Sequence, residues 1–69
     1  MYVNMARNLR KQLKNIKEEL KTTQNIPIND FKNAFMITSG YGKNKVNEWT
    51  QHFVDLKLIQ INGEVVNIV

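Results

Sequence analysis

Apolar residues recur at helical spacing along the first third of the chain. Between Val3 and Lys21 they lie four, four, three and four positions apart, which is the period of one helix face. The residues of this stripe are Met5, Leu9, Leu13, Ile16 and Leu20. The pattern predicts a helix over 3–21. Pro27 donates no N–H and disfavours a helical Ile26, so residues 22–27 are predicted to form a connector.

Two shorter helical patterns follow the connector. The first predicts a helix over 30–37, with Asn29 as N-cap and Asp30 favourably placed in the first turn. Its buried face would hold Phe31, Ala34 and Phe35. Two glycines within residues 38–42 can adopt positive φ angles and predict a tight turn. The second pattern predicts a helix over 43–57 whose apolar stripe consists of Val46, Trp49, Phe53 and Leu56.

The last residues alternate as two β-branched runs joined by Asn62-Gly63. Asn-Gly favours a type I′ turn, because both central residues of that turn need a positive φ. The pattern predicts a hairpin of strands over 58–61 and 64–68, in which Ile61 faces Glu64 and Ile59 faces Val66. One side of this hairpin, predicted to pack on the helices, would hold Ile59, Ile61, Val66 and Ile68.

The length limits the number of domains. A chain of 69 residues supports one small core, so we expect a single α+β domain over 1–69. Its predicted parts are a long basic helix (1–22), two helices joined by a turn (28–57) and a C-terminal β-hairpin (58–69). There is no cysteine, no apolar run of the roughly 20 residues that span a bilayer and no apolar centre of a secretory signal near Met1. We therefore expect a cytoplasmic protein.

Positive charge is concentrated in the first helix. Ten Lys and Arg against six Asp and Glu give a net charge of +4. Six of the ten basic residues lie between positions 7 and 21: Arg7, Arg10, Lys11, Lys14, Lys17 and Lys21. A polyanion is the class of partner that such a distribution favours, although a charge kept for solubility is the alternative.

The order helix, helix, glycine turn, helix, hairpin resembles the winged helix-turn-helix family, most closely over 28–69. Three segments carry the resemblance: the turn Ser39-Gly40-Tyr41-Gly42, the helix start Lys43-Asn44-Lys45-Val46-Asn47-Glu48-Trp49 and the passage Leu56-Lys57-Leu58-Ile59. The resemblance implies a DNA-binding regulator or replication accessory, similar to the small stand-alone members that phages, archaeal viruses and plasmids encode. It also implies that the helix over 43–57 is the recognition helix, with its first turns in the major groove.

The polar face of that helix then supplies the DNA contacts. Its base-reading candidates are Asn44, Asn47, Glu48 and Gln51, because Asn and Gln pair with adenine and Glu accepts from cytosine. Lys43 and Lys45 are placed to reach phosphates. A bias towards A·T pairs is expected. A solvated polar helix face without function would have the same composition.

The hairpin tip departs from a DNA-binding wing. Asn62-Gly63-Glu64 offers a carboxylate and no cation, so the wing is predicted to be structural. Phosphate contacts are then expected from the first helix and from the turn before the recognition helix. The candidates are Arg7, Arg10, Lys11, Lys14, Lys17, Tyr41 and Lys43.

Three alternatives remain open at this level. The stripe Leu9, Leu13, Ile16 and Leu20 has the spacing of a short coiled-coil seam and could form a homodimer, or it could cover the core of its own chain. Tyr41 or Tyr2 could stack on unpaired bases, as in a single-stranded DNA-binding accessory of a mobile element. A protein-interaction adaptor would instead pair its first helix with a partner helix.

Catalytic chemistry lacks its usual residues. His52 is the only histidine and there is no cysteine, so neither a Cys-His pair nor a zinc site can form within one chain. The segment Gly40-Tyr41-Gly42-Lys43 lacks the spacing of a phosphate-binding loop. We expect no enzyme activity, no metal, no cofactor, no small-molecule substrate and no membrane partner.

Overall fold

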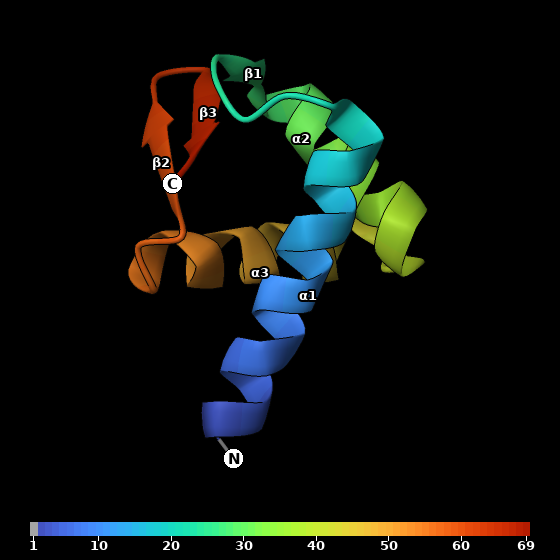
Figure 1. Ribbon diagram of the computed structural model, residues 1–69. Helices are drawn as coiled ribbons and strands as arrows, with labels where there is room; N and C mark the ends of the chain where they lie inside the picture. Colours follow the sequence, from blue (N-terminus) through green and yellow to red (C-terminus); the bar gives the residue numbers. More distant parts are fainter. Residues whose placement is uncertain (1) are drawn as a thin grey trace.

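The protein is an α+β fold of three helices and a small antiparallel sheet. The computed structural model describes residues 2–69, with side chains from Asn8 onward. The elements in chain order are α1 (Tyr2–Leu20), β1 (Ile26–Pro27), α2 (Ile28–Ser39), α3 (Lys43–Asp55), β2 (Ile59–Asn62) and β3 (Val65–Ile68). In Figure 1, α1 crosses in front of α3 and the sheet lies at the far end of the molecule from the N-terminus. The predicted three helices and C-terminal hairpin are confirmed; β1 was not predicted.

From Leu9 onward α1 packs through the predicted apolar stripe, mainly against α2, whereas the side chain of Met5 lies outside the described residues. Leu9, Leu13 and Ile16 are buried, and Leu20 packs against the same core from a half-buried position. The helix ends where Lys21 adopts a φ of 58° and donates its N–H to the Lys17 carbonyl over 2.7 Å. No helix within residues 2–69 is long and apolar enough to cross a membrane.

α2 starts earlier than the sequence predicted. The helix begins at Ile28 after Pro27, so Asn29 lies inside the first turn and its prediction as N-cap is wrong. The start is fixed from outside the helix, because the Ile28 N–H donates to the Glu64 carbonyl over 2.8 Å. At the other end Gly40, with a φ of 76°, donates its N–H to the Met36 carbonyl over 2.9 Å, as a left-handed cap residue does.

α3 ends at Asp55, two residues before the predicted end. Lys57 adopts a φ of 60° and turns the chain into β2. Leu56, expected on the buried stripe, is therefore 48% exposed, and Thr50 is buried instead beside Val46 and Phe53. The Thr50 hydroxyl donates to the Val46 carbonyl over 2.7 Å, which satisfies the buried polar group.

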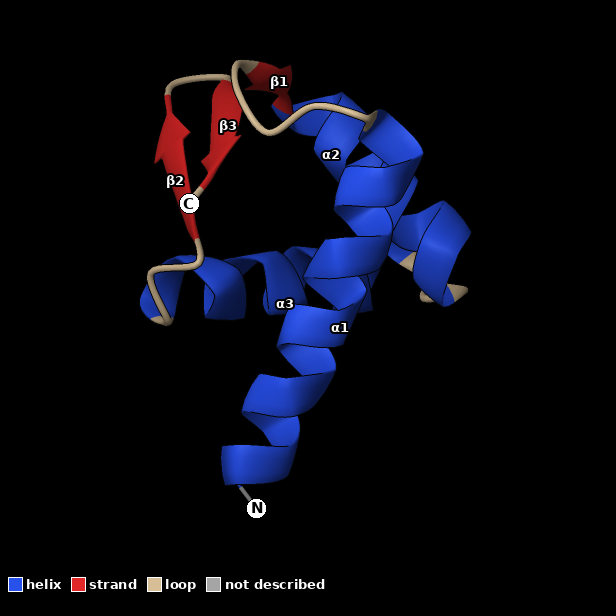
Figure 2. Ribbon diagram, viewed as in Figure 1, coloured by secondary structure: helices blue, strands red, loops and turns tan. Residues whose placement is uncertain are grey.

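The sheet has the order β1-β3-β2, with both pairings antiparallel (Figure 2). Asn62 pairs with Val65 and Ile61 with Val66, so the predicted pairing of Ile61 with Glu64 is wrong. The turn residues are Gly63 and Glu64, and only Gly63 has a positive φ, of 63°. The predicted type I′ turn needs a positive φ at both central residues and is therefore wrong; a positive φ at the first central residue alone is the pattern of a type II′ turn.

The hairpin nevertheless presents the predicted side to the helices. Ile59 pairs with Ile68 and Ile61 with Val66, so all four share one side. Moving the turn by one residue shifts each cross-strand partner by two positions, which preserves the side to which every residue points. Ile59, Val66 and Ile68 are buried, while Ile61 is 37% exposed at the free edge.

Three phenylalanines form the centre of the core. The Phe53 ring of α3 lies 5.3 Å from the Phe35 ring and 6.1 Å from the Phe31 ring, centroid to centroid. All three are fully buried, and the rest of the buried apolar set is Leu9, Leu13, Ile16, Ile26, Ala34, Val46, Ile59, Val66 and Ile68. Each of the six elements contributes to this one cluster, so the core fixes how α3 is presented.

Candidate nucleic-acid interface

The outer face of α3 carries the predicted DNA-reading residues together. Val46, Thr50 and Phe53 are buried, so the opposite side of the helix faces solvent. All six predicted contacts on this helix are exposed: Lys43, Asn44, Lys45, Asn47, Glu48 and Gln51. The predicted polar face is therefore continuous over the first turns of α3.

Some of these six side chains have partners within α3, and others have none. The Gln51 amide donates to the Asp55 carboxylate over 3.1 Å, and Glu48 lies 4.0 Å from His52 Nε2. Within the described part of the chain, no hydrogen bond involves the side chain of Asn44 or Asn47. The two asparagine amides retain their full capacity to bind a ligand, whereas Gln51 is already engaged.

Lys45 belongs to an aromatic stack with Tyr41 and Trp49. Its ammonium lies 4.1 Å from the centroid of the Tyr41 ring and 5.5 Å from that of Trp49. The two rings are 5.3 Å apart, and Tyr41 also lies 5.9 Å from Phe35. Cation–π attraction therefore competes with any phosphate for Lys45.

The stack changes the predicted roles of two residues. Tyr41 is half-buried in it instead of standing free at the turn, and Lys45 is held along the helix surface. Sequence reasoning missed the stack, although Lys45 and Trp49 are spaced by four, the interval that brings side chains together on a helix. Tyr41 joins them from the turn that leads into α3.

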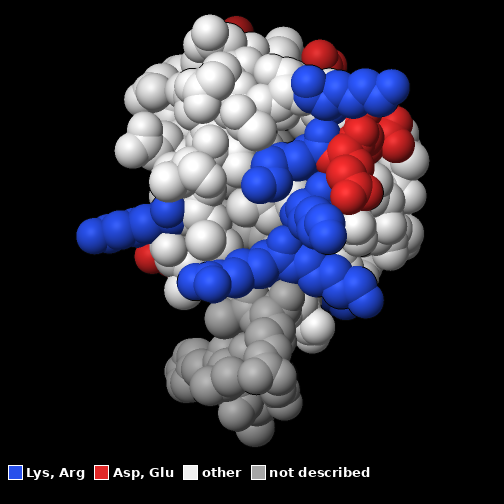
Figure 3. All heavy atoms as spheres, viewed as in Figure 1, with Lys and Arg blue, Asp and Glu red and all other residues white. Residues whose placement is uncertain are grey.

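The basic residues of α1 form a second surface. Arg10, Lys11 and Lys14 are exposed and Lys17 is half-buried. Figure 3 shows blue side chains gathered over α1, with red ones only towards its C-terminal end. Among the described residues no Lys or Arg lies within ion-pair distance of a carboxylate, so these cations are open to an anionic partner. The side chain of Arg7, also predicted here, lies outside the described residues, as does that of Tyr2.

The hairpin tip holds no cation. Asn62, Gly63 and Glu64 are exposed, and the Glu64 carbonyl holds the start of α2. In β3 the Ile68 N–H donates to the Thr23 carbonyl and the Asn67 side chain accepts from the Asn25 N–H, each over 2.7 Å. The hairpin thus fastens the connector between α1 and α2, which is a structural role.

The predicted dimer seam lies in the core. Leu9 and Ile16 are 0% exposed, Leu13 is 6% exposed, and Leu20 packs on the same cluster. A seam with a second copy would need these side chains at the surface, so their interpretation as a dimer contact is wrong for the folded chain. The stripe covers the core of its own chain.

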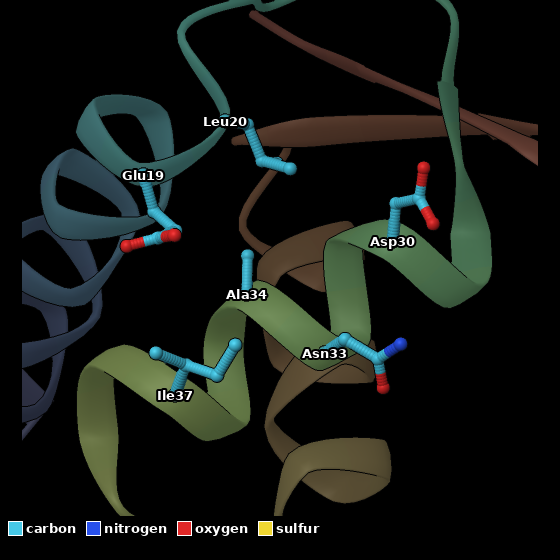
Figure 4. A pocket seen from close by; sticks show the side chains of 6 residues that line it. All are labelled: Glu19, Leu20, Asp30, Asn33, Ala34 and Ile37. Carbon is cyan, nitrogen blue, oxygen red and sulfur yellow. The ribbon is translucent and has the colours of Figure 1, made fainter.

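A shallow hollow of about 190 Å³ lies between the end of α1 and α2. Figure 4 shows Glu19 and Leu20 on one side of it and Asp30, Asn33, Ala34 and Ile37 on the other. Its two carboxylates repel phosphate, so this hollow is excluded as part of a nucleic-acid surface. Within the described residues no cluster of acidic and histidine side chains is arranged to hold a metal ion.

Comparison with known proteins adds no relative: no protein-family model matches the chain, and no curated protein or solved structure is significantly similar to it.

Proposed function

We propose that this chain is a winged helix-turn-helix protein that binds duplex DNA as a cytoplasmic regulator or replication accessory, without catalysing a reaction. α3 is the recognition helix and α1 supplies phosphate contacts. The observation that carries the proposal is the exposed polar face of α3, on which six predicted contacts lie together after a tight glycine turn. A helix presented in this way fits the major groove, where base edges differ in their donors and acceptors.

The charge of α1 supports the same proposal. Lys and Arg that neutralise phosphates release condensed counterions, and this release provides most of the non-specific affinity for DNA. The exposed Arg10, Lys11 and Lys14 supply cations that the hairpin tip lacks. α3 then contributes sequence preference and α1 contributes affinity.

Duplex DNA is favoured over the alternative partners. A single-stranded DNA platform needs an aromatic ring with a free face, and Tyr41 packs against Phe35 and Trp49 under the Lys45 ammonium. A partner helix that pairs with α1 needs an exposed apolar stripe, and the stripe of α1 is buried.

Fluorescence anisotropy with labelled duplex and single-stranded DNA over a salt series tests the proposal. We expect the logarithm of duplex affinity to fall linearly with the logarithm of salt concentration, and the sequence preference to weaken in Asn47→Ala. Asn33→Ala is the matched control, because Asn33 is also exposed but lies in the acidic hollow on α2. Absence of duplex binding at low salt would overturn the proposal.

Two lysines of α3 are expected to contribute differently to DNA binding. The salt slope is the steepness with which the logarithm of affinity falls against the logarithm of salt concentration. Lys43→Ala should lower this slope by about 0.9, the value for one lost phosphate contact. Lys45→Ala should leave the slope unchanged but cost about 0.5–1 kcal/mol of stability, because it removes the cation from the aromatic stack. Anisotropy gives the slopes, and urea unfolding followed by Trp49 fluorescence gives the stability. Equal slope changes in the two variants would contradict this division.

A further inference from the structure

We infer that α3 reads adenine in two neighbouring A·T pairs through Asn44 and Asn47, and that the same face discriminates against guanine. This inference rests on the proposed function and narrows it. The structure leaves these two amides without intramolecular partners in the described part of the chain, whereas Lys45 and Gln51 on the same face are engaged.

The chemistry of the bases separates adenine from guanine. In the major groove adenine presents a donor beside an acceptor, which matches the amide of Asn, and guanine presents two acceptors, which match Arg or Lys. The α3 face has no arginine, and its central lysine is held over Tyr41 and Trp49. Lys43, in the first turn of α3, is assigned to a phosphate in the proposed docking mode.

Glu48 strengthens the discrimination. It is strongly exposed, with 71% of its side chain open to solvent, and lies one turn after Asn44 and next to Asn47. A carboxylate accepts hydrogen bonds and repels the paired acceptors of guanine, but it tolerates the amino group of adenine or cytosine. Its neighbour His52 is 4.0 Å away and leaves it open to solvent.

The spacing of the two asparagines suits adjacent base pairs. Residues three apart share a helix face and advance about 4.5 Å along the axis. Successive base pairs are separated by about 3.4 Å, so two amides on one face meet neighbouring pairs. Gln51, one turn further along, would extend the reading to a third pair, but its amide donates to Asp55.

The test begins with selection of high-affinity duplexes from a randomised pool. We expect the selected duplexes to share two adjacent A·T pairs. Each adenine is then replaced by 7-deazaadenine, which lacks the N7 acceptor, and anisotropy measures the affinity. Loss of one half of a bidentate contact should weaken binding about tenfold at each adenine.

A mutant cycle assigns each adenine to its side chain. In Asn47→Ala one of the two deaza effects should vanish and the other persist, and Asn44→Ala should show the reverse pattern. Gln51→Ala should retain both effects, and Asn33→Ala, exposed on α2, should behave as wild type. Circular dichroism confirms that each variant is folded.

The possible failures are distinguishable. Duplex binding with a preference for G·C pairs, or with deaza effects that survive both asparagine variants, would overturn the inference and leave the proposed function standing. Duplex binding with no sequence preference would overturn the inference and the recognition role of α3, but not DNA binding by the chain. Absence of duplex binding at low salt would overturn both the inference and the proposed function.

Discussion

Replacing Phe53 by alanine is expected to leave a large fraction of the protein unfolded at room temperature. Phe53 is fully buried, and its ring packs against the rings of Phe31 and Phe35, which lie one turn apart on α2. Removing a buried phenylalanine costs about 3–5 kcal/mol. A core of this size supplies only about 3–5 kcal/mol of net stability, so the loss is comparable to the whole. Circular dichroism over a thermal scan measures the effect.

A matched control separates core loss from a general response to truncation. Ile37→Ala also removes a large apolar side chain, but Ile37 is 70% exposed on α2. Its effect should stay within about 0.5 kcal/mol. A Phe53→Ala variant that melts as wild type does would show that the three phenylalanines do not form the centre of the core.

Removing two cations from α1 should cause the largest loss of DNA affinity. The double variant Arg10→Gln/Lys14→Gln is expected to lower the salt slope by about 1.8 and the affinity by about 50-fold near 0.1 M salt, because two phosphate contacts disappear. Both side chains are exposed, so the fold should be unaffected. Anisotropy against a duplex of random sequence isolates this non-specific term.

The control for this variant carries the same change in net charge elsewhere. Lys32→Gln/Lys57→Gln removes two cations from α2 and from the turn after α3. If affinity depends only on the net charge of +4, the two double variants will bind alike, and α1 then has no particular role. If the steep salt dependence of affinity persists in Lys32→Gln/Lys57→Gln and is lost in the α1 variant, the phosphate contacts lie on α1.

Periodicity predicted the helices well because burial of one face determines them. Leu9, Leu13 and Ile16 are buried as their spacing indicated, and so are Phe31, Ala34 and Phe35. The side of the hairpin that faces the helices was also predictable, since it depends on alternation alone. Each of these features arises from local pattern and a single core.

The features that sequence did not predict depend on contacts between distant residues. β1 has only two residues, and it is a strand because Ile26 and Pro27 pair with Val66 and Val65. α2 begins at Ile28 because of the distant Glu64 carbonyl, and not because of a local capping side chain. The sequence around each of these elements does not show which distant residue will pair with it.

The candidate site likewise has features that the sequence predicted and features that it did not. Exposure of the α3 face follows from the period of the helix and was predicted. Engagement of Lys45 and Gln51 depends on which rotamer each side chain adopts. Spacing by four permits such contacts without requiring them, so the sequence could identify the candidates but could not select among them.

The position of β3 has a consequence for how the chain acquires its structure. β3 is the middle strand of the sheet, yet it follows every other element in the sequence, and its partner β1 lies about forty residues upstream. During synthesis β1 and β2 therefore emerge before the strand that both require. The helices can form locally as they appear, but the sheet, the start of α2 and the connector become fixed in one late step. Such coupling makes the fold cooperative and delays presentation of α3 on a rigid scaffold until that strand has been made.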